Sequence, residues 1–445
     1  MGTRHDSGMS EAAARSVVEK LRAKGFQALY AGGCVRDTLL GIEPHDYDVA
    51  TSARPEEVEA LFPRTVPVGA QFGVILVLEQ SQEIQVATFR GDGSYRDGRH
   101  PESVIYTDAE GDARRRDFTV NGLFYDPVTS EVLDFVGGRE DLNAGILRAI
   151  GTPSERFSED KLRLLRAVRF ATTLGFTIDP ETWKALLKRA PEIHAVSAER
   201  IREELCKILL SPNRVRGFDL LDESGLLREI LPEMEALKGC DQPPEFHPEG
   251  DVFVHTRLML TLLKPDASLP LVLSVLFHDL GKPATRVVDE TGRIRFNGHE
   301  GVSSEISLRI MHRLRFPNEV IDAVIPAVRL HMSFKDVPNM RVATLKRMMA
   351  RPTFEEELEL HRVDCLASHG MLDNHATLIA KREEFGRAPL IPEPLVTGHD
   401  LIGLGWKPGK RFAEILQAVQ TRQLEGSLNS REEALAWITS EFSAQ

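Results

Sequence analysis

Short apolar runs alternate with turns and polar loops over residues 26–140. The β-branched and aromatic residues typical of strands mark residues 26–33, 74–78, 83–89, 103–106 and 132–138. A helix is expected after Ser52, where a capping residue is followed by an early proline and two glutamates. This pattern predicts an α/β block of about 140 residues, in which strands, loops and helices alternate.

From residue 151 the pattern changes to the three-and-four spacing of amphipathic helices. Helix starts are expected at Thr152–Glu155 and again at Ser158–Asp160, where a hydroxyl residue precedes acids. Prolines and a glycine between residues 243 and 250 mark a boundary near residue 245. The expected domains are an α/β head over 1–150, a helical neck over 151–245, a second helical domain over 246–375 and a helical tail over 376–445.

The length of 445 residues is enough for about three domains. With 42% hydrophobic and 27% charged residues, the composition is that of a globular protein. No apolar run approaches the ~18 residues that a bilayer span needs, and the N-terminus lacks an apolar signal region, so no membrane partner is expected. Four widely spaced cysteines indicate reduced thiols and a cytoplasmic protein: Cys34, Cys206, Cys240 and Cys365.

The net charge and its distribution along the chain lead to different expectations about nucleic-acid binding. The 55 lysines and arginines against 67 acids give a net charge of −12, which at face value argues against broad capture of a nucleic-acid backbone. The charge is uneven, however: residues 142–216 hold 14 basic and 9 acidic residues, a local +5, and residues 217–251 hold 2 and 10, a local −8. The predicted neck is therefore basic enough to accommodate an RNA end.

Candidate chemistry begins with two carboxylates. Asp46 and Asp48 are two residues apart in a β-type run, so both side chains are expected on the same strand face. Carboxylates held that close need a neutralising cation, and Mg²⁺ suits oxygen ligands. Upstream, Gly32-Gly33 lets the backbone approach a ligand closely, and Arg36 lies where a helix could begin beside a phosphate. Asp-x-Asp alone is also typical of a surface turn; the Gly-Gly-x-x-Arg-Asp stretch before it favours a site.

These residues resemble the nucleotidyltransferases of the DNA polymerase β superfamily, and more narrowly the class II tRNA CCA-adding enzymes and bacterial poly(A) polymerases. Five stretches carry the resemblance in the order of that family: residues 32–37, 45–51, 115–121, 134–141 and 158–170. The resemblance implies a polymerase β-like head in which Asp46 and Asp48 hold Mg²⁺. It also implies contacts with the nucleotide from Gly32, Gly33, Arg36, Arg116 and Asp117.

The fifth stretch offers a way to choose a base without a template. On a single helix, Asp160 and Arg163 would share a face, as would Glu159 and Arg163. An aspartate accepts and an arginine donates hydrogen bonds, so together they can imitate a Watson–Crick edge. The resemblance assigns this task to Asp160 and Arg163, with Glu159 steering Arg163 and with Arg166 and Arg169 near the triphosphate or base. In isolation, the same residues are also typical of first-turn acids and a solvated ion pair.

Three positions are compared with the family pattern. A Glu is usual where this chain has Gln85, and because Gln cannot act as a base, Glu83 on the same strand face is a candidate third carboxylate. The polar loop over residues 90–112 has the full length that in this family accompanies ATP use, which disfavours CC-only addition. Poly(A) polymerases usually carry Gly-Arg-Arg-Phe near residues 68–73, and its absence here favours tRNA as the acceptor.

A second constellation follows the apolar run over residues 269–277. It would bury the adjacent His278 and Asp279, which is costly without a ligand, and nitrogen plus carboxylate oxygen suits a transition metal. With His255 and Asp364 these residues resemble the HD metal-dependent phosphohydrolases, which some CCA-adding enzymes carry after the head. Two further histidines resemble a longer, two-metal variant: His299 and His331. The domain is then either a hydrolase of phosphomonoesters or 2′,3′-cyclic phosphates on RNA, or a helical scaffold without activity.

The sequence therefore predicts an α+β protein with a polymerase β-like nucleotidyltransferase head, followed by an all-α neck, an HD domain and a tail. The predicted function is addition of CMP and AMP from CTP and ATP to the 3′ end of tRNA. An A-adding enzyme or poly(A) polymerase, and an HD-type phosphohydrolase, remain as alternatives. Three basic residues of the tail are either contacts for tRNA phosphates or part of an ordinary basic helix start: Lys407, Lys410 and Arg411. The oligomeric state is left open.

Overall fold

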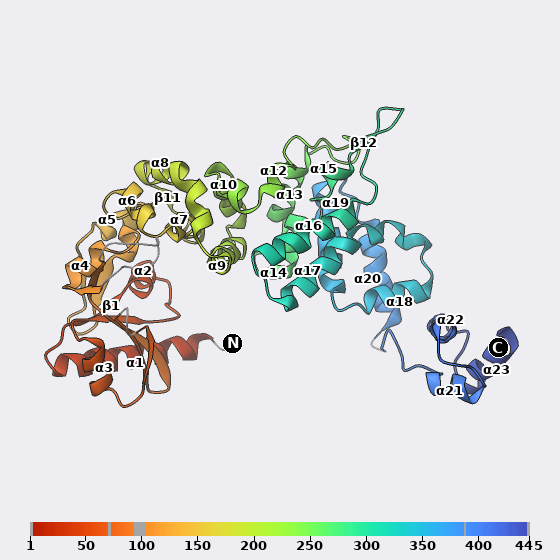
Figure 1. Ribbon diagram of the computed structural model, residues 1–445, viewed down its shortest axis with the longest axis horizontal. Helices are drawn as coiled ribbons and strands as arrows, with labels where there is room; N and C mark the ends of the chain where they lie inside the picture. Colours follow the sequence, from red (N-terminus) through yellow and green to blue (C-terminus); the bar gives the residue numbers. More distant parts are fainter. Residues whose placement is uncertain (1–2, 70–72, 93–103, 387–388, 443–445) are drawn as a thin grey trace. The chain divides into compact units, whose positions relative to one another are not determined.

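The computed structural model describes residues 3–69, 73–92, 104–386 and 389–442 (Figure 1). It contains two compact units, residues 1–232 and 233–445. Unit 1 holds the sheet and the helices of the predicted head and most of the neck, and unit 2 is almost entirely helical. The predicted α+β class is confirmed, whereas the finer division into four domains stays a prediction.

A seven-stranded mixed sheet organises the first part of unit 1. Its order is β3 (Thr65–Gly69), β4 (Val74–Glu79), β5 (Gln82–Thr88), β2 (Asp48–Thr51), β1 (Ala28–Ala31), β8 (Leu123–Asp126) and β9 (Glu131–Asp134). Only β2 and β5 run parallel, and every other neighbouring pair is antiparallel. Alternation along β5 buries Ile84 and Val86 and exposes Glu83 and Gln85. Helix α1 (Thr3–Ala23) packs against β1, β2, β4 and β5.

Helices and short strands complete unit 1. They are α2 (Gly33–Leu39), α3 (Pro55–Leu61), β6 (Arg90–Asp92), β7 (Val104–Tyr106), α4 (Ala109–Arg114), η2 (Thr119–Asn121), α5 (Gly138–Ala144), β10 (Ile146–Leu147), α6 (Pro153–Glu159), α7 (Leu162–Leu174), β11 (Thr177–Ile178), α8 (Pro180–Arg189), η3 (Ala190–Ala195), α9 (Ala198–Leu209), α10 (Arg214–Glu223) and α11 (Leu226–Ile230). Helix α7 packs on α9 and α10 and buries nine of its thirteen residues, so it forms the centre of the helical part.

The prediction that Asp46 and Asp48 share one strand is wrong for Asp46. Strand β2 begins at Asp48, whose partner on β1 is Ala31. Strand β1 ends at Ala31, and the next residue, Gly32, has a φ of 74° and turns the chain into α2. Because β1 ends there, Asp46 has no strand residue to pair with and lies in the loop that leads into β2.

The predicted helix start at Ser158–Asp160 is also wrong. Helix α6 begins at Pro153 after Thr152, as the first of the two start signals predicts, and continues through Ser158 to Glu159. Asp160 has an extended backbone, with φ −138° and ψ 109°, and α7 begins at Leu162. Asp160 and Arg163 therefore do not share a helix face. The Asp160 carboxylate instead accepts a hydrogen bond from the Leu162 amide at 3.0 Å.

Unit 2 is built from helices with one small hairpin. Its elements are α12 (Pro232–Glu235), which begins on the last residue of unit 1, α13 (Val252–Leu262), α14 (Leu269–Phe277), α15 (Lys282–Thr285), β12 (Val287–Val288), β13 (Ile294–Arg295), α16 (His299–Arg313), α17 (Asn318–Leu330), η4 (His331–Asn339), α18 (Val342–Met349), α19 (Phe354–Ala367), α20 (Asp373–Phe385), α21 (Gly398–Gly403), α22 (Lys410–Leu424) and α23 (Arg431–Glu441). Helices α13, α14, α16, α17 and α19 pack together, and α14 is the most deeply buried of them.

The last helices form a small core of their own around Leu401, Ile415 and Ile438. Within the described part of the chain, no helix combines the length and the apolar character that crossing a membrane requires.

Candidate active site

A hollow of about 720 Å³ in unit 1 brings together residues from five separate stretches of sequence. It is lined by eleven of the twelve residues predicted for metal and nucleotide: Gly32, Gly33, Arg36, Asp46, Asp48, Arg116, Asp117, Asp160, Arg163, Arg166 and Arg169. The twelfth, Glu159, lies behind the hollow and binds Arg163. A volume of this size suits a drug-sized or nucleotide-sized ligand.

The two metal-site candidates lie beside the turn from β1 into α2. A side chain at position 32 would come within 3.0 Å of the Arg116 guanidinium, so Gly32 provides both the turn and the close approach. Desolvation by the walls of the hollow raises the pKa of Asp48, and the neighbouring Asp46 carboxylate adds to this effect against the opposing charge of Arg116. A divalent cation would relieve both penalties, and two carboxylates leave coordination positions for phosphate oxygens. This donor set therefore fits such an ion.

A buried carboxylate positions two arginines at the hollow. Asp112, on α4, accepts hydrogen bonds from Arg115 Nε at 2.8 Å and from Arg116 Nη2 at 3.0 Å. Its side chain is 2% exposed. Burial alone would raise the pKa of Asp112, but the two guanidinium charges lower it below its usual value. The ionised carboxylate thus holds both arginines in place before any ligand arrives.

Asp117 orders the opposite wall. Its carboxylate accepts hydrogen bonds from Arg166 Nε at 2.8 Å and Asn121 Nδ2 at 3.0 Å, and Asn121 Oδ1 in turn accepts one from Arg36 Nη1 at 2.7 Å. Burial opposes ionisation of Asp117, but Arg166 and Asn121 outweigh it and lower the pKa to about 2. The Asp117 carboxylate therefore orients Arg166 directly and Arg36 through Asn121, and both arginines line the hollow.

The two residues predicted to choose the base are held by different elements. Arg163 donates to Glu159 Oε2 at 2.6 Å, so the predicted contact forms, although Glu159 ends α6 and Arg163 lies in α7 and not on the same helix. Arg163 also donates to the backbone oxygens of Arg156 at 2.9 Å and Arg115 at 3.2 Å. Asp160 is held by the Leu162 amide and by Arg200 of α9, whose Nη2 lies 3.1 Å from Asp160 Oδ2. Both side chains reach the same hollow even though they are not on one helix.

Several lining residues were not among the predicted ones. They are Arg115, Asn121, Leu162, Phe170, Arg200 and Lys207. Arg200 and Lys207 are seven residues apart on α9, which is about two helical turns, so helical spacing alone could have paired them. In total, eight cationic side chains line the hollow against four carboxylates, an arrangement that attracts an anionic ligand.

The stretch over residues 134–141 has a structural role. Asp134 accepts hydrogen bonds from four consecutive backbone amides at the start of α5, those of residues 136–139. A side chain at Gly138 would lie 2.2 Å from the Thr119 oxygen, so glycine allows α5 to pack against η2. This packing supports Asn121 and thereby the wall of the hollow.

The third-carboxylate hypothesis gains no support from the site. In the parallel register of β2 and β5, Val49 pairs with Val86, so Gln85 is the neighbour of Asp48 on the adjacent strand. Glu83 is exposed two residues earlier and is not among the residues that line the hollow. The predictions made from the loop over 90–112 and from residues 68–73 depend on residues 93–103 and 70–72, which lie outside the described residues.

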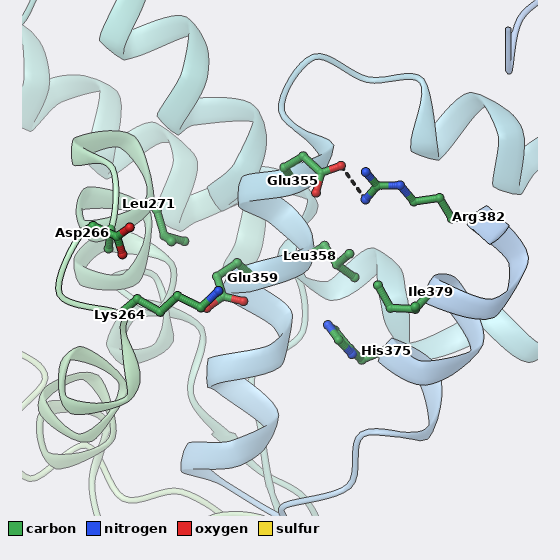
Figure 2. A pocket seen from close by; sticks show the side chains of 10 residues that line it. Lys264, Asp266, Leu271, Glu355, Leu358, Glu359, His375, Ile379 and Arg382 are labelled. Carbon is green, nitrogen blue, oxygen red and sulfur yellow. Dashed lines mark ion pairs between the residues drawn. The ribbon is translucent and has the colours of Figure 1, made fainter. Parts of the chain in front are cut away.

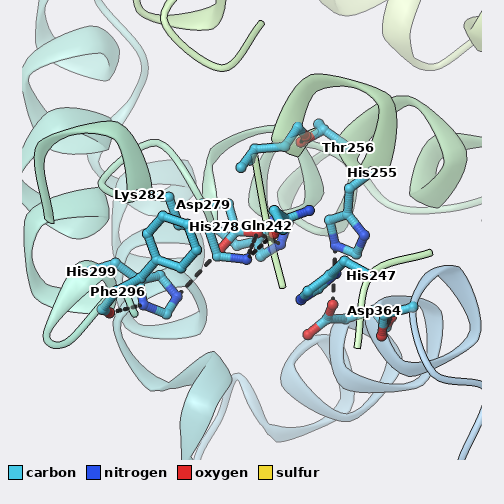
Figure 3. Close-up of polar contacts among 12 residues, drawn as sticks. Gln242, His247, His255, Thr256, His278, Asp279, Lys282, Phe296, His299 and Asp364 are labelled. Atoms are coloured by element: carbon cyan, nitrogen blue, oxygen red, sulfur yellow. Dashed lines mark hydrogen bonds and ion pairs between the residues drawn. The ribbon is translucent and has the colours of Figure 1, made fainter. Parts of the chain in front are cut away.

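Unit 2 contains a separate cluster of buried imidazoles and carboxylates (Figure 3). It includes all six residues predicted for the second metal site: His255, His278, Asp279, His299, His331 and Asp364. They come from α13, the end of α14, the start of α16, the end of α17 and α19, so helices distant in sequence converge on one point.

Four imidazoles of this cluster each contact a neighbouring oxygen through the same ring nitrogen, Nδ1. Nδ1 lies 2.9 Å from a backbone carbonyl in His278 and 2.7 Å from one in His299 and in His331, and in His255 it lies 2.6 Å from Glu249 Oε1. Because a carbonyl can only accept, we assign the proton to Nδ1 in His278, His299 and His331, which leaves the Nε2 lone pair free in these three rings, whereas His255 lies between two carboxylates, Glu249 at Nδ1 and Asp364 at Nε2.

These free lone pairs face one another and the Asp279 carboxylate. Nε2 of His299 lies 3.1 Å from Nε2 of His331 and 3.2 Å from Asp279 Oδ1. His278 Nε2 and both Asp279 oxygens are buried without a hydrogen bond of normal geometry. Buried acceptors without donors are costly, and mixed nitrogen and oxygen donors suit a transition metal. The donor set therefore fits one or two such ions.

Charges in the cluster are strongly coupled. Burial lowers the pKa of His255, but its bonds to Asp364 and Glu249 raise it more, to about 9. Burial and the nearby His278 lower the pKa of His331 to about 3. Burial opposes ionisation of Asp279, but His278 and Lys282 hold its pKa well below the usual value.

Four neighbours of the cluster were not predicted: Gln242, His247, Glu249 and Lys282. Glu249 accepts hydrogen bonds from His255 and His247, with Nδ1 of His247 at 2.9 Å. Lys282 Nζ lies 2.7 Å from Asp279 Oδ2 and 2.6 Å from Gln242 Oε1. Lys282 follows the His-Asp pair by three residues and was within reach of the motif, whereas Glu249 lies in the proline-rich stretch that indicated only a boundary.

Beside this cluster, a second hollow of about 480 Å³ opens between the aromatic rings of Phe246 and Phe296 and the side chains of Arg293 and Lys335. Another hollow of unit 2, of about 370 Å³, is lined by α19, α20 and the stretch from Lys264 to Leu271 (Figure 2). Three of its charged residues pair with side chains, Arg382 with Glu355 at 2.6 Å and Glu359 with Arg362 at 2.6 Å, and we assign no ligand to it.

Comparison with known proteins assigns the head. Residues 28–148 match the "Poly A polymerase head domain" family, and residues 175–238 match the family described as "Probable RNA and SrmB- binding site of polymerase A". The mixed sheet and the carboxylate-bearing hollow thus define a nucleotidyltransferase head followed by an RNA-binding type of helical region.

Relatives narrow the assignment further. The chain is 44% identical over 219 residues to the CCA-adding enzyme of Streptococcus pneumoniae (strain CGSP14), covering 49% of this chain and 54% of that protein. The structure of the Bacillus stearothermophilus CCA-adding enzyme in complex with CTP is similar with a TM-score of 0.72, 28% identity and 96% coverage of both chains. The Thermotoga maritima CCA-adding enzyme complexed with tRNA shares the fold, with a TM-score of 0.62, 19% identity, and coverage of 97% of this chain and 95% of that chain. Over its first half the chain is thus similar to CCA-adding enzymes, and it spans about half the length of the curated relatives it matches.

Proposed function

We propose that this protein adds CMP and AMP, from CTP and ATP, to the 3′ end of tRNA. The observation that carries the proposal is the hollow of unit 1, where two carboxylates, a glycine turn and eight cationic side chains meet the base-reading pair Asp160 and Arg163. The likeness to a CCA-adding enzyme in complex with CTP, over 96% of both chains, supports this reading.

In this proposal each wall of the hollow has one task. Asp46 and Asp48 would hold Mg²⁺, which when bound neutralises charge on the α-phosphate and on the leaving pyrophosphate. Arg36 and Arg116 bind the triphosphate, already oriented by Asn121 and Asp112. The tRNA 3′ oxygen forms the new bond to the α-phosphorus, and the bond to the bridging oxygen breaks in line with it.

Base choice follows from Asp160 and Arg163. The Asp160 carboxylate accepts a hydrogen bond from the exocyclic amino group of cytosine or adenine, and Arg163 donates to the ring acceptor. Arg163 is held by Glu159 and two backbone oxygens, so its guanidinium is ordered before the base enters. The helices of unit 1 that follow would position the tRNA end through its shape and phosphates. The four free cysteines, none joined by a disulfide, support a cytoplasmic location.

Transfer to tRNA that lacks its CCA end tests the proposal. With labelled CTP and labelled ATP, incorporation of both supports CCA addition, whereas ATP alone supports an A-adding enzyme. Long runs of A on other RNAs would support poly(A) synthesis, and no incorporation of either label contradicts nucleotidyl transfer.

We propose a second function, that of a metal-dependent phosphohydrolase, for the cluster of unit 2. The specific observation is the set of buried Nε2 lone pairs around Asp279, which a transition metal would satisfy. Such an ion when bound activates water for attack on a phosphate ester. Lys282 and the arginine-bearing hollow beside the cluster would hold the phosphate. Phosphate release from 2′,3′-cyclic or 3′-phosphorylated RNA tests this function, and metal-loaded protein without that activity would leave the cluster as a structural metal site.

A further inference from the structure

The Asp160 carboxylate, which we assign to base reading, has fewer contacts with the protein than its partner Arg163. Three hydrogen bonds anchor Arg163, to the Glu159 carboxylate and to the backbone oxygens of Arg156 and Arg115. Asp160 lies between two helices with an extended backbone, so no helical neighbour orders its side chain. One of its oxygens caps α7 through the Leu162 amide, and the other meets only one side chain in the described bonds, that of Arg200.

Arg200 is itself rigidly placed. It lies in the first turn of α9, whose residues Ile201, Leu205 and Ile208 are buried against the rest of the helical region. Four residues further on, Glu204 is 4% exposed and pairs with Arg169 of α7. The guanidinium of Arg200 therefore reaches the hollow from a fixed support, with 24% of its side chain exposed there.

We propose that Arg200 sets the choice of nucleotide by fixing the orientation of the Asp160 carboxylate. The inference rests on the proposed transfer to tRNA and adds to it a residue outside the base-reading pair. Arg200 binds Oδ2 of Asp160 at 3.1 Å, while the Leu162 amide binds Oδ1 at 3.0 Å. With each oxygen engaged once, the plane of the carboxylate is fixed and its remaining lone pairs have one direction.

That direction separates amino bases from keto bases. Cytosine and adenine present an exocyclic amino group, which donates to a carboxylate, whereas uracil and guanine present a carbonyl oxygen at the matching place, which a carboxylate repels. If Arg200 is lost, the Asp160 side chain keeps only its bond to Leu162 and can turn away. The attraction of the Asp160 carboxylate for an amino base and its repulsion of a keto base then both decrease. Arg200 acts here as a positioning residue, because its effect on the base passes through Asp160.

Arg200→Met tests this role, because methionine keeps much of the chain length but cannot donate. The full chain is assayed with tRNA lacking CCA, and kcat/KM is measured for CTP, UTP, ATP and GTP. We expect the preference for CTP over UTP, and for ATP over GTP, to fall about tenfold or more, as for the loss of one charge-assisted interaction. Arg200→Lys retains a charged donor and should restore most of the preference. Arg228→Met, at an exposed arginine of α11, is the matched control and should leave the preference unchanged.

A direct contact between Arg200 and the triphosphate gives a different result. All four nucleotides carry the same triphosphate, so a phosphate ligand would lower kcat/KM equally for each of them. Such a uniform loss, or an unchanged preference in folded Arg200→Met protein, overturns the proposal.

A double-mutant comparison provides a second test. Once Asp160 is replaced by Ala, Arg200→Met should change nucleotide preference no further, because the residue through which Arg200 acts is gone. An added loss of preference in the Asp160→Ala background overturns the proposal.

Equilibrium binding of CTP and UTP separates this inference from the proposed function. If the protein prefers CTP in binding but transfers nothing to tRNA, the proposed function fails, and the binding ratio of Arg200→Met alone decides the inference. If the unmodified protein does not distinguish CTP from UTP, the inference is overturned.

Discussion

The two functional regions of this molecule treat charge in opposite ways. In the hollow of unit 1, Arg115, Arg116 and Arg166 already bind carboxylates of their own chain, so their charges are oriented but partly compensated before a ligand arrives. In the cluster of unit 2, the imidazole Nε2 atoms of His299 and His331 lie 3.1 Å apart beside the Asp279 carboxylate, for which Lys282 is the lysine partner on the other oxygen. The first region is preorganised for an anion, and the second is left incomplete without a cation.

This difference determines whether each site affects ligand binding or the stability of the protein without its ligand. Preorganised arginines bind a triphosphate without reordering, which favours fast exchange of one nucleotide for the next. Buried unpaired acceptors destabilise the metal-free protein and are stabilised only when an ion binds. We therefore expect changes in unit 1 to act on transfer and changes in unit 2 to act on metal content and stability.

The largest effect should come from Asp48→Asn. Loss of one of two metal-binding carboxylates should lower the rate of nucleotide transfer by at least about a thousandfold. The metal content of unit 2 should not change, because Asp48 is not part of that cluster. Transfer rates and metal analysis on the same preparation check both parts, with Glu43→Gln as the acidic control outside the hollow. Transfer within tenfold of normal would contradict the assignment of the first site.

The next largest effect tests the second region. His278→Ala should weaken binding of a transition metal to unit 2 about a hundredfold or more, since it removes a central donor. Nucleotide transfer should stay within about twofold. Metal titration followed by elemental analysis measures the first effect, and His312→Ala, an exposed histidine of α16, serves as control. Unchanged metal occupancy in His278→Ala would rule out the cluster as a metal site.

A smaller effect is expected from a residue that does not face the ion. Glu249 binds Nδ1 of His255 at 2.6 Å and thereby keeps its Nε2 directed at the cluster. Glu249→Gln should weaken metal binding about tenfold, as is typical for partners of ligating histidines. Competition with a chelator of known affinity gives the number. An effect as large as that of His278→Ala would mean that Glu249 is itself a ligand.

The smallest effect concerns acid stability of unit 1. Because the pKa of Asp117 is lowered to about 2, its ionised form stabilises the fold above pH ~4, and this stability is lost as the pH falls toward 2. The free energy of unfolding should exceed that of Asp117→Asn by about 2 kcal/mol near neutral pH, with the difference shrinking below pH 4. Denaturant unfolding of both proteins between pH 7 and pH 3 checks the slope. A constant difference over that range would contradict the ionised Asp117–Arg166 pair.

Much of the first site could be predicted because many of its residues lie in short contiguous stretches of sequence. The residues from Gly32 to Asp48 and from Arg115 to Asn121 lie next to the strands that place them, so contiguous motifs were enough for the family resemblance that singled them out, although Asp46 lies in the loop before its strand. Asp160 was placed on the wrong element because two start signals lie six residues apart, and the first of them, with its proline at the first helical position, propagates through the second.

The contributions that were missed come from distant stretches. Arg200 reaches Asp160 across 40 residues, and Asp112 acts only because it is buried under two arginines. Glu249 follows a proline-rich stretch without any helical or strand periodicity. Such roles depend on packing between elements, which periodicity and motif spacing do not contain.

The central claim is that the hollow of unit 1 extends a tRNA end with selected nucleotides. Its most direct test is the mass of tRNA that lacks its CCA end, after incubation with the protein, Mg²⁺, CTP and ATP. We predict a product heavier by two cytidylate residues and one adenylate residue, and no such product with Asp48→Asn. An unchanged mass, or a product extended with adenylate alone, would contradict the account.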